Sequence, residues 1–362
     1  MSASAQPLVS IVTPVYNEEE YLAECVESIL AQTYQNWEYT IVNNCSTDRT
    51  LEIARGYAAK DSRIRVHNNE KFLKMLANHN VAVRQISPES KYCKVVLGDD
   101  FIFPECLEKM VAVAEAHPTV GLVSAYEECG DQIRITGLPA DQDFVDGREA
   151  SRQFLMDKLL LFGSQNSVMY RSDLVRGRDP FYVETDSFAD FESCFALLCQ
   201  SDLGFVHQVL TFSRLRPQSA GAISSDIGSH YRSVLGLLFT YGHECLTREE
   251  FNERLDCNLS EYYRFLGRRF WVDRDSQFWS FHKTAFAELG MTLSRARLLR
   301  AAIAQLFSSF LQPKASMESF KRIFRLRRMR NSQIRRVALE TSKDSVLNAN
   351  TVEDGETLAR SS

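Results

Sequence analysis

The adjacent carboxylates Asp99 and Asp100 are the feature of this 362-residue chain that most directly suggests chemistry. They follow Gly98 at the end of an apolar run, and neighbouring carboxylates repel each other unless a cation or a proton intervenes. Hard divalent cations bind oxygen ligands, often one or two carboxylates together with phosphate oxygens of a substrate. The pair therefore predicts a cation site. The alternative is a turn in which an aspartate caps the helix expected near Pro104.

Two further polar clusters follow apolar runs in the same way. They are Thr13–Glu18 and Asn43–Asp48, which come after the runs at 8–13 and 37–42. In an open parallel sheet, ligands bind at the carboxyl ends of the strands. If the runs are parallel strands, all three clusters converge on one edge of the sheet, and we expect the functional site there.

The elements that must position these clusters alternate along the chain. β-Branched runs at 8–13, 37–42, 64–67, 92–97 and 119–126 predict strands, and helical spacing occurs at 18–31, 48–59, 72–86 and 104–116. Strands separated by helices predict βαβ units and a parallel sheet. Further strands are expected at 163–170 and 205–215, with helices at 148–161 and 191–200. From about residue 229 onward the pattern is helical.

The runs Val9–Glu18, Ile41–Asp48 and Leu97–Asp100 together resemble the family 2 glycosyltransferases of the GT-A fold. The resemblance covers roughly residues 8–216. It implies an α/β fold of the GT-A type, Rossmann-like, with a mostly parallel central sheet and flanking helices. It also implies inverting transfer of a sugar from a nucleotide-diphosphate sugar, with a UDP-sugar favoured, to a saccharide or lipid-linked saccharide. A divalent cofactor, Mg²⁺ or Mn²⁺, and a place in envelope or exopolysaccharide synthesis follow from the same resemblance.

The resemblance also assigns residues to the donor site. Those expected to bind the nucleotide sugar are Pro14, Tyr16, Asn17, Glu18, Asn43, Asn44, Asn80, Asp99 and Arg214. Asn44 occupies the position that usually reads the base, and Asp99 and Asp100 match the metal-binding region. Arg214 is expected to face the leaving diphosphate, because arginine can bind phosphate with two parallel hydrogen bonds. The alternative for Arg214 is a solvated loop.

The chain departs from the family pattern at two places. Asn43-Asn44-Cys45-Ser46 stands where the family commonly shows Asp-Asp-Gly-Ser, and an amide donates as well as accepts hydrogen bonds. Leu97 aligns with the usual first aspartate of the metal motif. We therefore expect altered base recognition, and cation binding that depends on Asp99, Asp100 and the diphosphate.

An acidic segment, Thr185–Glu192, precedes an apolar helical run and resembles the family segment that supplies the general base. The matching residue is Asp190, with Glu192 as the second candidate. A positioned base contributes about 10²–10⁴ in rate by removing the proton of the attacking hydroxyl. The alternative is an acidic helix N-terminus, where the helix dipole stabilises carboxylates. Gly163–Ser167 is expected to border the acceptor pocket.

Charge is distributed unevenly. The whole chain has a net charge of −5, yet residues 295–336 contain twelve Lys or Arg and one acid, Glu318. Leucines, isoleucines and phenylalanines alternate with these arginines, so the segment predicts a basic amphipathic helix. Such a helix can lie on an anionic membrane surface, or it can pack on the acidic body of the protein. No nucleic-acid-binding pattern is recognisable.

These observations predict three parts: a catalytic domain at 1–225, a helical region at 226–340 and a disordered acidic tail at 341–362. The chain lacks an apolar run of about 18 residues, and Met1–Pro7 lacks the features of a signal peptide. We therefore expect a cytoplasmic protein, peripheral on the inner face of the cytoplasmic membrane if the basic segment binds lipid. Two other functions stay open: a nucleotide-binding module without catalysis, and a membrane-surface scaffold.

Overall fold

The computed structural model describes residues 6–184, 188–216, 227–271, 273 and 275–311. Contacts divide the chain into two compact units. The first comprises Met1–Tyr262 with Ser280–Thr292, and the second comprises Tyr263–Trp279 with Leu293–Ser362. The division falls within the long helix α10 (Arg248–Phe270), beyond the boundary expected near residue 225.

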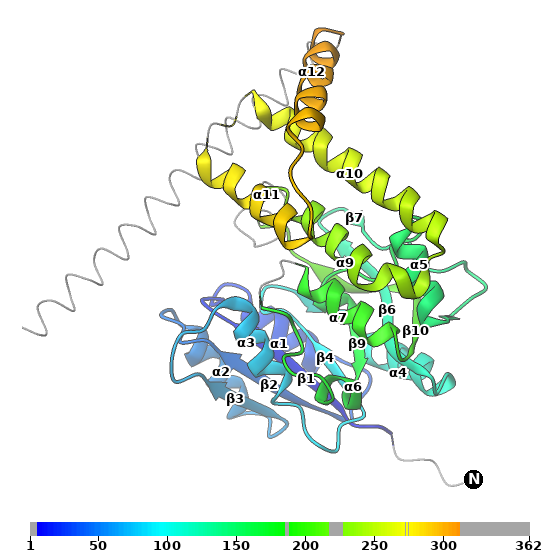
Figure 1. The fold of residues 1–362 in the computed structure, drawn as a ribbon. Coiled ribbons are helices and arrows are strands. Elements are labelled where there is room, and N and C mark those ends of the chain that lie inside the picture. Colours follow the sequence, from blue (N-terminus) through cyan, green and yellow to red (C-terminus); the bar gives the residue numbers. More distant parts are fainter. Residues whose placement is uncertain (1–5, 185–187, 217–226, 272, 274, 312–362) are drawn as a thin grey trace, which may run out of the picture. The chain divides into compact units, whose positions relative to one another are not determined.

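The first unit is built on one ten-stranded mixed sheet, shown in Figure 1. Its strands lie in the order β3-β2-β1-β4-β9-β6-β10-β5, with β7 paired to β6 and β8 paired to β10. The strands are β1 (Val9–Val15), β2 (Trp37–Asn43), β3 (Ile64–Asn68), β4 (Tyr92–Val95), β5 (Phe101–Ile102), β6 (Val120–Cys129), β7 (Gln132–Ile133), β8 (Phe144–Val145), β9 (Val168–Arg171) and β10 (Asp202–Ser213). Strands β1 to β4 run parallel to one another, and β6 runs parallel to β10.

The antiparallel strand β9 lies between β4 and β6 and joins the two parallel groups. It is shorter than the strand expected at 163–170, because residues 165–167 form a 3₁₀ turn, η1 (Gln165–Ser167), before the strand begins. The other strands expected from the sequence are present within a few residues. The expected α/β fold is therefore confirmed, but its central sheet is mixed rather than mostly parallel, because β5, β7, β8 and β9 pair antiparallel with their neighbours.

Helices cover both faces of the sheet. They are α1 (Leu22–Leu30), α2 (Thr50–Ala58), α3 (Met75–Val83), α4 (Cys106–Ala116), α5 (Gly147–Leu155), α6 (Ser172–Arg176) and α7 (Ala189–Leu198). Successive residues of a strand point to opposite faces, and every residue of β1 is buried. Val9 and Ile11 pack in one apolar cluster with residues of α1 and α4, whereas Val12 packs in another with residues of α3, α5 and α7.

The helix expected at 148–161 is shorter than predicted. Asp146 caps α5 by accepting hydrogen bonds from the backbone nitrogens of Arg148 and Glu149. The helix ends at Leu155, and Asp157 then adopts a φ of 56°, in the left-handed region that no helix can continue through. The chain therefore leaves the helix after Leu155 and continues without helical structure to η1.

From residue 227 onward, the described residues form α9 (Ser229–Cys245), α10, α11 (Ser276–Glu288) and α12 (Arg295–Leu311), which confirms the expected helical C-terminal region. The acidic tail expected at 341–362 and most of the basic segment, 312–336, lie outside the described residues. Among the helices described, none has the length and apolar character needed to cross a lipid bilayer.

Candidate functional site

Hydrogen bonds join the loops that follow β1 and β2. The backbone nitrogen of Asn17 donates to Ser46 Oγ (3.0 Å), and that of Glu18 donates to Thr50 Oγ1 (2.7 Å). Asn17 Oδ1 in turn accepts from the backbone nitrogen of Thr47 (2.8 Å). Asn17 adopts a φ of 54°, which asparagine tolerates better than most residues. The two polar clusters expected at these strand ends are therefore in direct contact.

Asp99 and Asp100 lie in the turn between β4 and β5. Asp100 is buried, and its carboxylate accepts hydrogen bonds from the backbone nitrogen of Arg214 (2.8 Å) and from Ser213 Oγ (3.1 Å). Burial and the neighbouring charge of Asp99 raise the pKa of Asp100 to about 8. Helix α4 begins after Glu105, so neither aspartate caps it, although both lie in a turn.

Arg216 connects Asp99 with the loop after β1. Its Nη2 lies 2.5 Å from Asp99 Oδ2 and 2.9 Å from Glu18 Oε1, and its Nη1 lies 3.0 Å from Glu18 Oε2. Burial raises the pKa of Glu18, and the hydrogen bond from Arg216 opposes that shift. The Nε of Arg216 is buried and has no hydrogen-bond partner in the part of the chain that the structure describes. The Arg216 guanidinium thus lies between two carboxylates, and its Nε–H group can still donate one hydrogen bond.

Arg214, the arginine chosen from the sequence, is used differently. Its Nε donates to the backbone oxygen of Asp99 (3.0 Å), and its Nη2 lies 2.6 Å from Glu24 Oε2. The guanidinium also lies over the ring of Tyr21, 4.5 Å from its centroid. The arginine that contacts the Asp99 carboxylate is Arg216, which was not among the residues expected to bind the donor. The spacing Arg-x-Arg was the available signal, because side chains two apart in an extended segment share one side.

Ser213, which bonds to Asp100, also bonds to a buried glutamate. Glu127 accepts hydrogen bonds from Ser213 Oγ (2.8 Å) and from Ser164 Oγ. Lys94 is fully buried, and its Nζ donates to the backbone oxygens of Asn166 and Val168. Burial lowers the pKa of Lys94. Lys94 and Glu127 were not expected from the sequence, although a charged residue inside an apolar strand pattern is the signal that marks them, whereas Ser164 and Asn166 belong to the segment Gly163–Ser167 named above.

Asn43 and Asn44 are brought to the expected edge, but both are buried. Asn43 Nδ2 donates to Asn68 Oδ1 (2.6 Å). Asn44 forms a pair of bonds with the backbone of Leu73: its Oδ1 accepts from the nitrogen (2.9 Å) and its Nδ2 donates to the oxygen (2.8 Å). An aspartate could not donate the second bond, which explains the amide at this position. The structure thus uses Asn44 to hold the segment at residue 73.

The remaining expected donor residues differ in exposure. Pro14 is buried within β1. Tyr16 is 44% exposed and its ring meets that of Phe72 edge-on, with 4.9 Å between centroids. Phe72 is itself exposed, so this aromatic pair presents apolar surface, and Tyr16 directly precedes Asn17 in the chain. Asn80 instead clamps a backbone segment, because its amide both donates to Tyr182 O (2.9 Å) and accepts from Tyr182 N (2.8 Å).

The two candidate bases lie in the first turn of α7. Asp190 Oδ1 accepts from the backbone nitrogen of Phe191 (2.9 Å). Glu192 accepts two hydrogen bonds from Arg178 Nη2 (2.7 Å each) and one from Tyr241 OH (2.6 Å). The carboxylate of Glu192 is therefore already engaged with two protein groups. Residues 185–187, at the start of the expected acidic segment, lie outside the described residues.

Helix α3 contacts the segment at Tyr182, which precedes α7. Burial, with a smaller contribution from the charge of Asp190, raises the pKa of Tyr182. The ring of Tyr182 lies 6.2 Å from that of His79, and Asn80 holds the Tyr182 backbone. Helix α3 therefore contacts the segment that leads to α7.

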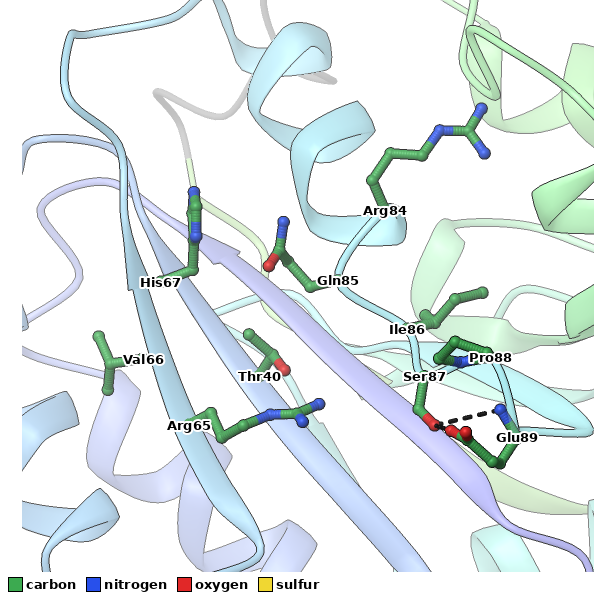
Figure 2. A pocket seen from close by; sticks show the side chains of 10 residues that line it. All are labelled: Thr40, Arg65, Val66, His67, Arg84, Gln85, Ile86, Ser87, Pro88 and Glu89. Atoms are coloured by element: carbon green, nitrogen blue, oxygen red, sulfur yellow. Dashed lines mark hydrogen bonds between the residues drawn. The ribbon is translucent and has the colours of Figure 1, made fainter.

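A cavity of about 450 Å³ lies away from these residues. Figure 2 shows that its lining comes from β2, β3 and the segment that follows α3. The lining residues are Thr40, Arg65, Val66, His67 and Arg84–Glu89, and none of the expected site residues is among them.

Asp99 and Asp100 can supply only some of the ligands of a divalent cation. Among the described residues, no group of three or more His, Cys, Asp or Glu side chains gathers as a metal site. The two carboxylates supply the hard oxygen atoms that such a cation prefers, although Arg216 already lies 2.5 Å from Asp99 Oδ2. A cation held here would take its other ligands from water and substrate phosphates, as Mg²⁺ usually does.

Comparisons with known proteins agree with this geometry. Residues 10–177 match the family described as glycosyl transferase family 2. EpsE of Bacillus subtilis (strain 168) is 42% identical over 112 residues, which are 31% of this chain and 40% of EpsE. Glycosyltransferase GlyG of Streptococcus pneumoniae serotype 4 is 36% identical over 124 residues, which are 33% of this chain and 40% of GlyG. The match thus spans about two fifths of the length of each relative.

Two solved structures share the fold. S. aureus TarS 1–349 in complex with UDP-GlcNAc has a TM-score of 0.56 and 18% identity, over 84% of this chain and 92% of that chain. The mannosyltransferase PcManGT from Pyrobaculum calidifontis, in complex with GDP-Man and Mn²⁺, has a TM-score of 0.51 and 15% identity, over 84% of this chain and 88% of that chain. With the sheet order and the edge site described above, these matches show that the chain has the GT-A fold and that its residues 10–177 are similar to glycosyl transferase family 2.

Proposed function

We propose that this protein is an inverting glycosyltransferase that moves a sugar from a nucleotide-diphosphate sugar to a saccharide or lipid-linked saccharide acceptor. The observation that carries the proposal is the meeting of Glu18, Asp99 and Arg216 at the carboxyl ends of β1 and β4. A UDP-sugar is the favoured donor, and the likeness to the UDP-GlcNAc complex of TarS supports this choice. Envelope or exopolysaccharide synthesis is the proposed setting, and the cytoplasm is the proposed location.

The donor binds across the edge formed by the loops after β1, β2 and β4. Tyr16 and Phe72 offer an exposed aromatic surface on which a base can stack. Asp99 and Asp100 would hold Mg²⁺ or Mn²⁺, which when bound offsets negative charge on the diphosphate. The likeness to the Mn²⁺ complex of PcManGT supports a divalent cation.

Arg216 changes partners when the donor binds. Its guanidinium leaves the Asp99 carboxylate and binds the diphosphate, because two of its N–H groups can donate in parallel to two phosphate oxygens as they do to a carboxylate. The unpartnered Nε supplies a further donor for this contact. Arg214 keeps its bonds to Asp99 and Glu24 and holds the loop in place.

Asp190 acts on the acceptor. As the acceptor oxygen attacks the anomeric carbon, the bond from that carbon to the diphosphate oxygen breaks, and Asp190 takes the hydroxyl proton. The attack comes from the face opposite the leaving group, so the anomeric configuration inverts. Glu192 is a positioning residue, because Arg178 and Tyr241 hold its carboxylate at the start of α7.

A thermal-shift screen against UDP-, GDP-, dTDP- and CMP-sugars, with and without Mn²⁺, tests the proposal. A bound ligand raises apparent stability by mass action, so the true donor raises the melting temperature most, and only with the cation. Transfer assays with that donor then test catalysis. No stabilisation by any donor would overturn the proposal. Binding without turnover would instead support the silent nucleotide-binding module, which Leu97 and the engaged amide of Asn44 favour.

A further inference from the structure

Helix α12 in the second unit packs on α10 through one of its faces. Leu298 and Ala302 are buried, and Trp271 Nε1 donates to the backbone oxygen of Ala302 (3.0 Å). Gly267 of α10 approaches so closely that a Cβ there would lie 2.7 Å from the backbone carbon of Ala301. This face of α12 is therefore fixed by close contact between two helices.

A second stripe of α12 is apolar and exposed. Its residues are Leu299, Ile303, Leu306 and Phe307, with exposed fractions of 48%, 42%, 37% and 68%. Residues four and three apart lie on one side of a helix, so the four side chains form a continuous row. Large apolar side chains rarely gather on a protein surface unless they contact a partner or a membrane.

Arginines border this stripe. At 3.6 residues per turn, Arg295 lies on one side of the row and Arg300 on the other. The helix contains no acidic residue, and the sequence that follows, residues 312–336, adds nine Lys or Arg and one acid, Glu318. A partner that fits this surface therefore has an apolar region next to negatively charged groups.

The geometry points to an anionic lipid bilayer as the partner of the α12 stripe. Leu299, Ile303, Leu306 and Phe307 enter the region between headgroups and acyl chains, and Arg295 and Arg300 bind lipid phosphates. A second copy of the chain would bring the same arginines against these arginines, and residues 312–336 carry the same sign of charge. A nucleic acid would match the charge and leave the apolar row exposed. The inference is independent of the proposed enzymatic function.

Vesicle co-sedimentation of the full chain tests this inference. Vesicles of phosphatidylcholine alone are compared with vesicles of equal parts phosphatidylcholine and phosphatidylglycerol. The variants are Leu299→Ser/Phe307→Ser, which interrupts the row, and Arg295→Gln/Arg300→Gln, which removes its borders. Ile133→Ser is the matched control, because Ile133 is 51% exposed on the short strand β7. Circular dichroism and thermal unfolding check that each variant folds.

We expect the natural protein and the Ile133→Ser control to sediment with the anionic vesicles, and less so as salt is added. Both α12 variants should lose binding by about tenfold or more. Equal binding by Leu299→Ser/Phe307→Ser would overturn the inference, because the basic residues beyond α12 would then account for attachment. Binding to phosphatidylcholine alone that is as tight as binding to the mixture would also overturn the inference. So would sedimentation velocity showing that the natural protein is a dimer and that only Leu299→Ser/Phe307→Ser dissociates it.

Discussion

Arg216 sets the balance of charge at the carboxyl edge, because its guanidinium lies between Asp99 and Glu18. Without a ligand the three groups neutralise one another in part, while Asp100 remains buried beside them with a raised pKa. A divalent cation and the diphosphate of a nucleotide sugar bring two charges of each sign. They can therefore replace the bond from Arg216 to Asp99 without leaving a buried charge unpaired.

Replacement of Arg216 by glutamine should separate cation binding from turnover. Since the competing guanidinium is gone, Mn²⁺ alone should bind more tightly, measured by calorimetry without nucleotide. Because the diphosphate contact is also lost, kcat/KM should fall by roughly 10²–10³. Arg49→Gln, which removes an exposed arginine paired with Glu52, is the control and should change neither quantity. Unchanged Mn²⁺ affinity together with unchanged kcat/KM in Arg216→Gln would refute the proposal that Arg216 moves from Asp99 to the diphosphate.

The two carboxylates at the start of α7 should respond differently to substitution. Asp190→Asn should lower transfer by about 10²–10⁴ and leave donor binding unchanged, because a base acts only on the acceptor proton. Glu192→Gln should instead lower the free energy of unfolding by about 1–3 kcal/mol, since Arg178 loses its charged partner. Kinetics and denaturant unfolding of both variants check this assignment. The opposite pattern, with full activity in Asp190→Asn, would identify another base.

At the scale of elements, hydrogen bonds between loops and helices fix the edge. Asn44 ties the end of β2 to Leu73, and His79 of α3 bonds to Gln165 of η1 (2.9 Å). Both side chains are buried, so their polar atoms cannot exchange protein partners for water without cost. The stability of the protein should therefore depend on each of these two connections.

Asn44→Asp, which restores the residue common in the family, should destabilise the chain. A carboxylate cannot donate to Leu73 O and would instead repel it, at a cost of about 1–3 kcal/mol. Asn36 donates to Gln6 O in the same manner but is exposed, so Asn36→Asp is the matched control and should cost far less. Denaturant unfolding measures both. If the two variants lose equal stability, the buried pair of bonds at Leu73 is not what requires an amide.

His79 should make the protein sensitive to acid. Burial lowers the pKa of His79 to about 4, whereas in the unfolded chain it stays near its ordinary value of about 6.5. Because the folded pKa is depressed, the unfolded chain binds the proton first. The contribution of His79 to stability is complete above pH 6.5 and is lost as the pH falls through 4.

The His79→Gln variant retains a polar partner for Gln165 but does not titrate. We therefore expect the unfolding free energy of the natural protein to drop by ~2 kcal/mol more than that of the variant between pH 7 and pH 4.5. Urea unfolding at several pH values measures the difference. Parallel pH profiles for the two proteins would show that His79 is not buried in its neutral form.

At the scale of the whole molecule, the sheet could be predicted where its strands follow a local pattern. The apolar runs at 8–13, 37–42 and 92–97 predicted the parallel strands β1, β2 and β4 and the edge at which their loops meet. The antiparallel insertion of β9 between β4 and β6 could not be predicted, because pairing depends on contacts far apart in sequence. The division of the chain inside α10 has the same cause.

The candidate site was predictable to a similar degree. Asp99, Asp100 and Asn17 follow strands directly, so their place at the edge follows from the sheet alone. The bond from Arg216 to Glu18 joins residues nearly two hundred positions apart, and no local pattern contains it. The amide of Asn44 looked like an altered base contact because its partner, the backbone of Leu73, has no signature in the sequence.

Calorimetric titration of the nucleotide selected by the thermal-shift screen is the most direct measurement of the central claim. It compares the natural protein with Asp99→Asn, in the presence and absence of Mn²⁺. If Asp99 holds the cation that contacts the donor diphosphate, the natural protein binds the nucleotide tightly only with Mn²⁺. Asp99→Asn then binds the nucleotide at least about tenfold more weakly in Mn²⁺. Equal affinity of the two proteins in Mn²⁺ would place the donor elsewhere on the molecule.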